Sequence, residues 1–176
     1  MSEPNREQVR VAIVTEVLRI EEDTLYSAKG HLEAARLWSS AHFYIGIPTT
    51  LIAAIAGVTA LKSQPIVAAV LAMTVAASSA LLTFLNPRER GATHLRAGNL
   101  YKALSNDARI FREVRCRQID ADAVLAKELD NLNSRRSKLN EESPPISRRA
   151  FKRGRQGIQD GEATYDADAR RIVGKS

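Results

Sequence analysis

The sequence predicts an all-α membrane protein: a two-helix transmembrane hairpin with a cytosolic N-terminal helix and long C-terminal helices packed together. Two observations lead to this fold class. Residues 39–61 and 63–87 contain no charged side chain and are separated only by Lys62, and each run exceeds the roughly 20 residues that a helix needs to cross a bilayer. All the other charged residues of the 176-residue chain, whose net charge is +6, lie outside these two runs.

Segment 1–41 predicts a cytosolic helix. Gly30 leaves two alternatives open, two helices or one flexed helix. Because the first apolar run starts only after many charged residues, we expect no cleaved signal peptide, and the first span serves as its own signal. Apolar and small residues recur at spacings of three or four, as on one helix face: Val9, Ile13, Val17, Ile20 and Thr24.

The sequence predicts that segment 42–86 forms the transmembrane hairpin, with spans at about 42–61 and 65–86. The connector is too short to hold a domain, so the two helices must run antiparallel. Pro65 suits the first turn of the second helix, where its missing N–H breaks no intrahelical bond. Asn86 and Pro87 mark the end of that helix.

The distribution of basic residues predicts that both termini are cytoplasmic. Lys62 is the only basic residue between the spans, whereas the opposite ends carry several, so the positive-inside rule places those ends in the cytoplasm. Four aromatic residues at the same ends are typical of an interfacial belt. The basic residues are Lys29, Arg36, Arg88, Arg90 and Arg96, and the aromatic residues are Trp38, Phe43, Tyr44 and Phe84.

The sequence predicts that segment 87–142 forms a long cytosolic helix, either one helix or two in line. Leu125, Leu132 and Leu139 recur at heptad intervals, and we expect this stretch to pack against the N-terminal helix rather than to form an uninterrupted coiled coil. The apolar stripe that precedes and overlaps this heptad contains Leu104, Ala108, Phe111, Ile119, Ala126 and Leu129.

In segment 143–176, Pro144 and Pro145 predict a linker, because consecutive prolines cannot continue a helix. After it we expect an amphipathic basic tail helix, since Phe151, Ile158 and Tyr165 recur every seven residues. Three explanations fit its basic cluster: nucleic acid, anionic lipid headgroups, or a solvated helix face. Without aromatic stacking platforms nucleic acid is the weakest of the three. Attraction to the anionic inner leaflet is better supported than nucleic acid, and a solvated helix face stays open beside it. The cluster contains Arg148, Arg149, Lys152, Arg153 and Arg155.

Small residues line one broad face of each span. In lipid, where hydrophobic association is weak, small side chains let helices approach closely and gain van der Waals contacts. The faces could pack within one hairpin or between hairpins, and we expect self-association in either case. The packing or pore candidates are Gly46, Thr50, Ala53, Gly57, Ala72, Ala76, Ser79, Ala80 and Thr83.

Neither span contains an Asp, Glu, Lys or Arg residue, which argues against a proton pump or a charge-coupled transporter. The hydroxyl groups at membrane depth, such as those of Thr50, Ser79 and Thr83, are consistent with a weakly selective oligomeric pore. The plainer alternative is that each hydroxyl bonds to the backbone of its own helix.

No motif predicts catalysis, a cofactor or a metal site, and we expect no enzymatic activity. The histidines His31, His42 and His94 are scattered, and Cys116 is a lone thiol. His42 and His94 both fall near the predicted cytoplasmic membrane surface. A proton sensor there is one interpretation, and polar residues suited to an interface are the favoured one.

Several juxtamembrane residues occur in a characteristic order: Trp38 with His42, Gly46-Ile47-Pro48, Thr83 to Pro87, then His94, Gly98 and Tyr101. In this order they resemble the SLATT family, the two-transmembrane effector domains of bacterial conflict systems that associate with SMODS nucleotidyltransferases and SLOG domains. The resemblance covers about residues 5–140 and rests on the order of these motifs and on the hairpin. It adds no catalytic residues, and we expect no fused sensor domain in the chain.

The resemblance implies an oligomeric pore-forming effector in the bacterial inner membrane, which disrupts ion gradients when a separately encoded nucleotidyltransferase or other sensor signals infection. In this interpretation Trp38, His42, Pro87, His94, Gly98 and Tyr101 couple the cytosolic helices to the spans. The main alternative is a non-conducting scaffold or regulator that anchors a helical platform for a cytosolic partner. A membrane-tethered enzyme is a third class of function, and no residues in the sequence support it.

Overall fold

The computed structural model describes residues 3–62, 64–119 and 121–163, and all regular structure in these ranges is helical. The chain divides into two compact units. We call Met1–Ala34 with His94–Ser176 the bundle unit, and Ala35–Thr93 the apolar unit. The helices are α1 (Glu3–Leu61), α2 (Pro65–Leu85), α3 (Pro87–Ile110), the π-helical turn η1 (Phe111–Arg115), α4 (Cys116–Gln118), α5 (Asp122–Glu142) and α6 (Arg148–Gln159).

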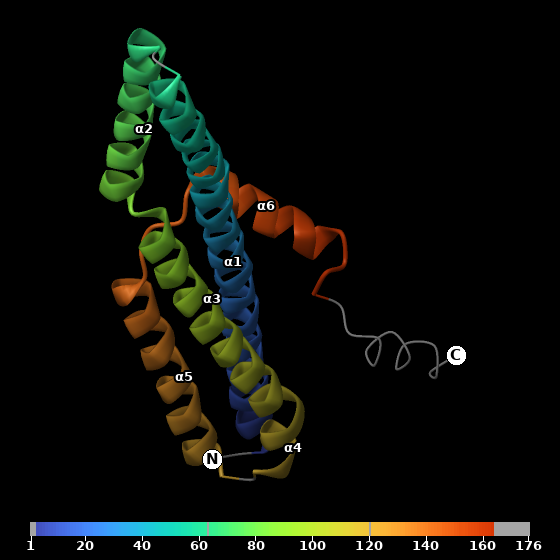
Figure 1. Cartoon of the computed structure of the whole chain (residues 1–176). Coiled ribbons are helices and arrows are strands. Elements are labelled where there is room, and N and C mark those ends of the chain that lie inside the picture. Colours follow the sequence, from blue (N-terminus) through green and yellow to red (C-terminus); the bar gives the residue numbers. More distant parts are fainter. Residues whose placement is uncertain (1–2, 63, 120, 164–176) are drawn as a thin grey trace. The chain divides into compact units, whose positions relative to one another are not determined.

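In the bundle unit, α3 and α5 lie beside the N-terminal part of α1 (Figure 1). The predicted stripe of α1 is confirmed as its buried face, since Val17, Ile20 and Thr24 are fully buried and Ile13 nearly so. Its partners come from α3, η1, α4 and α5, and burying these apolar side chains is the main stabilising contribution. The core contains Ile13, Val17, Ile20, Leu104, Ala108, Phe111, Cys116, Leu125 and Leu132.

The prediction of one helix, or two in line, over 87–142 is wrong. Helical structure stops after Gln118, Ile119 and Ala121 are extended, and α5 then returns antiparallel to α3. Two contacts fix this direction: the Tyr101 hydroxyl donates to Asn140 Oδ1 at 2.8 Å, and Arg135 pairs with Asp107 at 2.8 Å.

Contacts from α1 stabilise the break between α4 and α5. Arg10 Nη2 donates to the Ile119 carbonyl at 2.9 Å, which satisfies a carbonyl that no longer lies in a helix. Arg6 Nε and Arg10 Nε each lie 3.2 Å from an oxygen of the Asp122 carboxylate. The hydrogen bond from Arg6 is the largest cause that lowers the pKa of Asp122. The turn therefore depends on residues more than 100 positions earlier in the sequence.

The expected tail helix is confirmed as α6, and it packs on α1. Ala150 and Gly154 are buried, and a Cβ added at Gly154 would lie 2.8 Å from the backbone nitrogen of Gly30. Only glycine permits so close an approach. Gly30, expected to divide or flex the first helix, instead lies within the single helix α1 as part of this contact. Tyr165, part of the predicted heptad, lies outside the described residues.

The apolar unit contains the C-terminal part of α1, α2 and the first turns of α3. α2 runs back alongside α1 (Figure 1). Asn86, with φ of 42°, ends α2 in the left-handed conformation, and its backbone N–H bonds to the Leu82 carbonyl. Two helical segments, within Arg6–Leu61 and Pro65–Gln118, are long and apolar enough to cross a membrane, and none of the residues in their apolar windows is buried.

Candidate functional site

The α1–α2 contact in the apolar unit is a narrow seam. Its residues are half-buried and alternate at spacings of three and four, the repeat of helices that cross at a small angle. They are mostly medium or large, and a Cβ added at Gly46, just beside them, would lie 4.0 Å from Leu82. The seam residues are Ile45, Thr49, Ile52, Ala56 and Thr59 on α1, and Ala68, Leu71, Val75, Ser78 and Leu82 on α2.

The predicted small residues are mostly not in this seam but one position after it. One position is a rotation of about 100°, and because α1 and α2 run antiparallel, the same step on both helices turns both sets to the same side of the pair. We call this surface the small-residue face. Apart from half-buried Gly46 its members are exposed: Gly46, Thr50, Ala53, Gly57 and Ala60 on α1, and Ala69, Ala72, Ala76, Ser79 and Thr83 on α2.

The opposite side of the pair, one position before the seam, carries much larger residues. We call it the bulky face. Leu51 and Val70 on this face are 61% and 59% exposed, whereas a Cβ added at Gly57 on the small-residue face would meet nothing within 4 Å. The bulky face contains Tyr44, Pro48, Leu51, Ile55 and Val58 on α1, and Val67, Val70, Thr74, Ala77 and Leu81 on α2.

This arrangement refines the sequence interpretation. Most of the small residues are exposed in the α1–α2 pair, so they do not pack against the other helix of the same chain. Ala80, predicted with the others, lies two positions from the seam residues Ser78 and Leu82 and therefore faces away from α1, off the small-residue face.

The threonine hydroxyls in this unit bond to their own helix, as the plainer alternative predicted. Thr50 donates to the Gly46 carbonyl and Thr83 to the Ser79 carbonyl, each at 3.0 Å. Thr49, Thr59 and Thr74 do the same within their own helices. A hydroxyl used this way keeps acceptor lone pairs, so Thr50 and Thr83 still present oxygen atoms on the small-residue face.

The juxtamembrane residues predicted to couple the spans fall into both units. In the apolar unit the Arg90 guanidinium lies 5.2 Å from the centre of the Trp38 ring, a cation–π contact. Pro87 is buried, and His42 is half-buried with its ring 5.7 Å from that of Phe43. His94, Gly98 and Tyr101 belong to the bundle unit and pack there.

His94 forms a buried pair with His31, which the sequence did not suggest. Nδ1 of His31 on α1 lies 3.0 Å from Nδ1 of His94 on α3, and both side chains are buried. The contact is a hydrogen bond only if one ring donates and the other accepts, so at least one ring must be neutral. This differs from the expected position of His94 at a wet membrane surface.

Burial lowers the pKa of both histidines. For His31, burial and then repulsion from His94 lower the pKa to about 4, and burial lowers the pKa of His94 in the same direction. Both rings are therefore neutral at pH 7. Tyr101 stacks on His31 with ring centres 5.4 Å apart, and burial raises the pKa of its hydroxyl.

Gly98 permits the close contact of α3 with α1 beside this pair. A Cβ added there would lie 3.0 Å from Leu32 Cγ and 3.2 Å from the Ala28 carbonyl oxygen. The signal for the pair was present in the sequence, because His31 continues the buried spacing of Ile20, Thr24 and Ala28. The pairing itself depended on knowing that α3 packs on this face.

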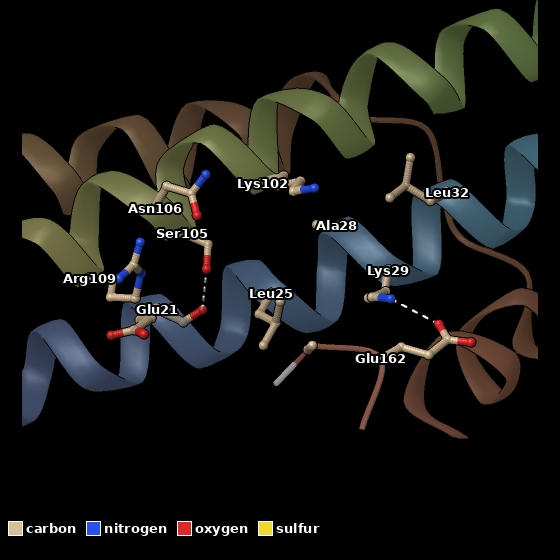
Figure 2. A pocket seen from close by; sticks show the side chains of 11 residues that line it. Glu21, Leu25, Ala28, Lys29, Leu32, Lys102, Ser105, Asn106, Arg109 and Glu162 are labelled. Carbon is tan, nitrogen blue, oxygen red and sulfur yellow. Dashed lines mark hydrogen bonds and ion pairs between the residues drawn. The ribbon is translucent and has the colours of Figure 1, made fainter. Parts of the chain in front are cut away.

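The bundle unit also contains a cavity of about 290 Å³ between α1, α3 and the turn after α6 (Figure 2). Lys29, Lys102 and Arg109 contribute positive charges to it, and sequence analysis did not group these residues. Cys116 is buried, which raises the pKa of its thiol. Within the described residues, no group of three or more His, Cys, Asp or Glu side chains is placed to hold a metal ion.

No protein-family model, curated protein or solved structure matches this chain. The resemblance to the SLATT family therefore rests on the residues quoted for it above.

Proposed function

We propose that this chain is an oligomeric, pore-forming protein of the bacterial inner membrane. In this proposal α1 and α2 form a transmembrane hairpin, both termini are cytoplasmic, and several copies associate through the small-residue face. The observation that carries the proposal is the contrast between the two sides of the α1–α2 pair: small residues and hydroxyls on one side, and large apolar residues on the other.

A helix pair in lipid gains little from hydrophobic association, so copies associate where small side chains allow close backbone approach. The small-residue face meets that requirement along the length of both helices. The bulky face, with Leu51 and Ile55, suits contact with acyl chains. In the oligomer, the oxygens of Thr50, Ser79 and Thr83 would supply the polar groups of a weakly selective pore, because no charged residue lies inside the spans.

The biological setting comes from the SLATT resemblance: an effector of a bacterial conflict system that collapses ion gradients after a separately encoded nucleotidyltransferase or other sensor signals. The bundle unit would hold the pore closed until then. Contact with anionic lipid is supported by the exposed basic side chains of α6, since each cation near an anionic surface contributes about 1 kcal/mol. These are Arg148, Arg149, Lys152, Arg153 and Arg155.

The runner-up is a non-conducting scaffold. The extensive bundle unit, which could present a platform to a cytosolic partner, favours it. A scaffold needs the spans only as an anchor, so substitutions on either face that preserve insertion leave its function intact. Substitutions on the small-residue face therefore distinguish the two functions, because they abolish the function of a pore and leave that of a scaffold intact.

Membrane potential in expressing cells tests the proposal. The test variant is Ala53→Leu/Ala76→Leu, on the small-residue face, and the matched control is Ala54→Leu/Ala77→Leu, which makes the same chemical change one position away on each helix. At equal membrane levels, the parent and the control should depolarise cells, followed with a voltage-sensitive dye, while the test variant should not. Depolarisation by both doubles alike would exclude the small-residue face as the pore-forming surface.

A further inference from the structure

We propose that the cavity between α1 and α3 binds a small phosphomonoester with an apolar body, and that the carboxylate of Glu162 occupies the anion position in its absence. Because the cavity lies wholly within the bundle unit, this site does not depend on pore formation. Three features support this site: the charges around the cavity, its apolar floor and the ion pair between Glu162 and Lys29.

The cavity has an excess of positive charge. Three cations line it against two carboxylates, and one of these, Glu21, is already held by Arg112 at 2.9 Å outside the lining. Lys102 is exposed and makes no ion pair or hydrogen bond with any residue that the structure describes. A phosphomonoester, with a charge between −1.5 and −2 at neutral pH, is thus attracted to this position.

Glu162 is a resident anion that a ligand can replace. Its carboxylate lies 2.9 Å from Lys29 Nζ, and its side chain is 56% exposed (Figure 2). Ion pairs between partly exposed side chains contribute little to stability, so a ligand with a larger negative charge can compete with Glu162 for Lys29. A phosphate at the same position would replace one charge with nearly two, and Lys102 lines the same cavity.

The floor of the cavity favours an organic phosphate over the inorganic ion. Leu25 and Ala28 lie on α1 between the two charged ends, with Arg109 and Glu21 at one end and Lys29 and Glu162 at the other (Figure 2). Leu32 extends the apolar surface, while Asn106 supplies a polar group from α3. A ligand pocket of this kind combines apolar walls with a few polar groups that fix orientation.

Isothermal titration calorimetry of the full chain in maltoside detergent tests the site. Phenyl phosphate is the probe, and inorganic phosphate is the comparison. Phenyl phosphate should bind more tightly than inorganic phosphate. Glu162→Gln should raise its affinity, because the competing carboxylate is gone, and Lys102→Gln should lower it by at least about tenfold. Lys127→Gln, on the exposed surface of α5, is the matched control and should bind like the parent.

Absence of binding to the parent and to Glu162→Gln would overturn the site. Equal losses in Lys102→Gln and Lys127→Gln would also overturn it, since only general charge would then matter. The source of the phosphomonoester follows from repeating the titration in nanodiscs of phosphatidylcholine with or without phosphatidic acid. A lipid headgroup as occupant predicts that phosphatidic acid abolishes phenyl phosphate binding, and a soluble ligand predicts unchanged binding. Neither result depends on whether the chain conducts.

Discussion

At the residue scale, the contact between His31 on α1 and His94 on α3 is a hydrogen bond that requires at least one of the two rings to be neutral. Protonating both rings would place two positive charges at a nitrogen separation of 3.0 Å in a buried site, where repulsion is weakly screened. Tyr101 stacks on His31 and offers no compensating negative charge, since its raised pKa keeps the hydroxyl protonated. The contact between α1 and α3 is therefore sensitive to acid.

The pKa of His31 gives the sign of this dependence. In the unfolded chain His31 binds a proton near its ordinary pKa of 6.5, whereas in the folded chain it does so only near 4. Between these values the unfolded state binds more protons, so the free energy of unfolding falls as pH falls, by up to about 1.4 kcal/mol per pH unit.

Replacing His31 should flatten this pH dependence. We expect His31→Asn, which keeps a polar amide but cannot titrate, to lose less thermal stability than the parent between pH 7 and pH 5. Circular dichroism melts of the full chain in detergent measure the difference, and His42→Gln, in the apolar unit, should behave like the parent. Equal losses in all three proteins would mean that the pair does not control acid stability.

At the element scale, α6 is held by a contact between two backbones rather than by large side chains. Gly154→Leu would drive a side chain into the Gly30 backbone, where a Cβ alone would already lie 2.8 Å from the nitrogen. We expect α6 to detach while the core of α1, α3 and α5 stays folded. Trypsin should then cleave among the basic residues of α6 at least about tenfold faster, which corresponds to about 1.4 kcal/mol of lost local stability.

Gln156→Leu is the control for this experiment, because it adds the same side chain to an exposed position of the same helix. Its cleavage rate should match that of the parent. Slow cleavage of Gly154→Leu would mean that the helix accommodates the side chain without detaching.

The proposed self-association of α1 and α2 also belongs to the element scale. Overpacking a tight helix contact costs about 1–3 kcal/mol, so Ala53→Leu/Ala76→Leu should weaken the oligomer by roughly 5- to 150-fold. Native mass spectrometry or chemical cross-linking in mild detergent measures the loss. Ala54→Leu/Ala77→Leu should associate like the parent, and a test variant as oligomeric as its control would place the interface elsewhere.

The helices differ in how far the sequence could predict them. The spans and the buried stripe of α1 follow from local patterns, either a run without charge or a spacing of three and four. The break at Ile119 could not be predicted, because no proline or glycine marks it and the extended backbone is stabilised by Arg10, 109 positions earlier. The cavity could not be predicted for the same reason: Lys29 and Lys102 line one cavity only after α3 packs on α1.

At the scale of the whole molecule, the proposed pore requires a definite membrane topology. With the spans in a membrane, the loop between α1 and α2 should lie outside the cytoplasm and the bundle unit inside it. In a Cys116→Ser background, Gln64→Cys should react with a membrane-impermeant maleimide on intact spheroplasts, whereas Ser134→Cys on α5 should react only after lysis. Reaction of both before lysis would contradict a hairpin with cytoplasmic termini.

Electrical recording from planar bilayers that contain the purified chain tests the central claim most directly. We expect discrete conductance steps from the parent and from Ala54→Leu/Ala77→Leu, and their loss in Ala53→Leu/Ala76→Leu at equal protein incorporation. Because the bundle unit is proposed to hold the pore closed until a signal arrives, the parent is also recorded after trypsin treatment. Silence of the parent in both states, or equal conductance from the two double variants, would contradict a pore built on the small-residue face.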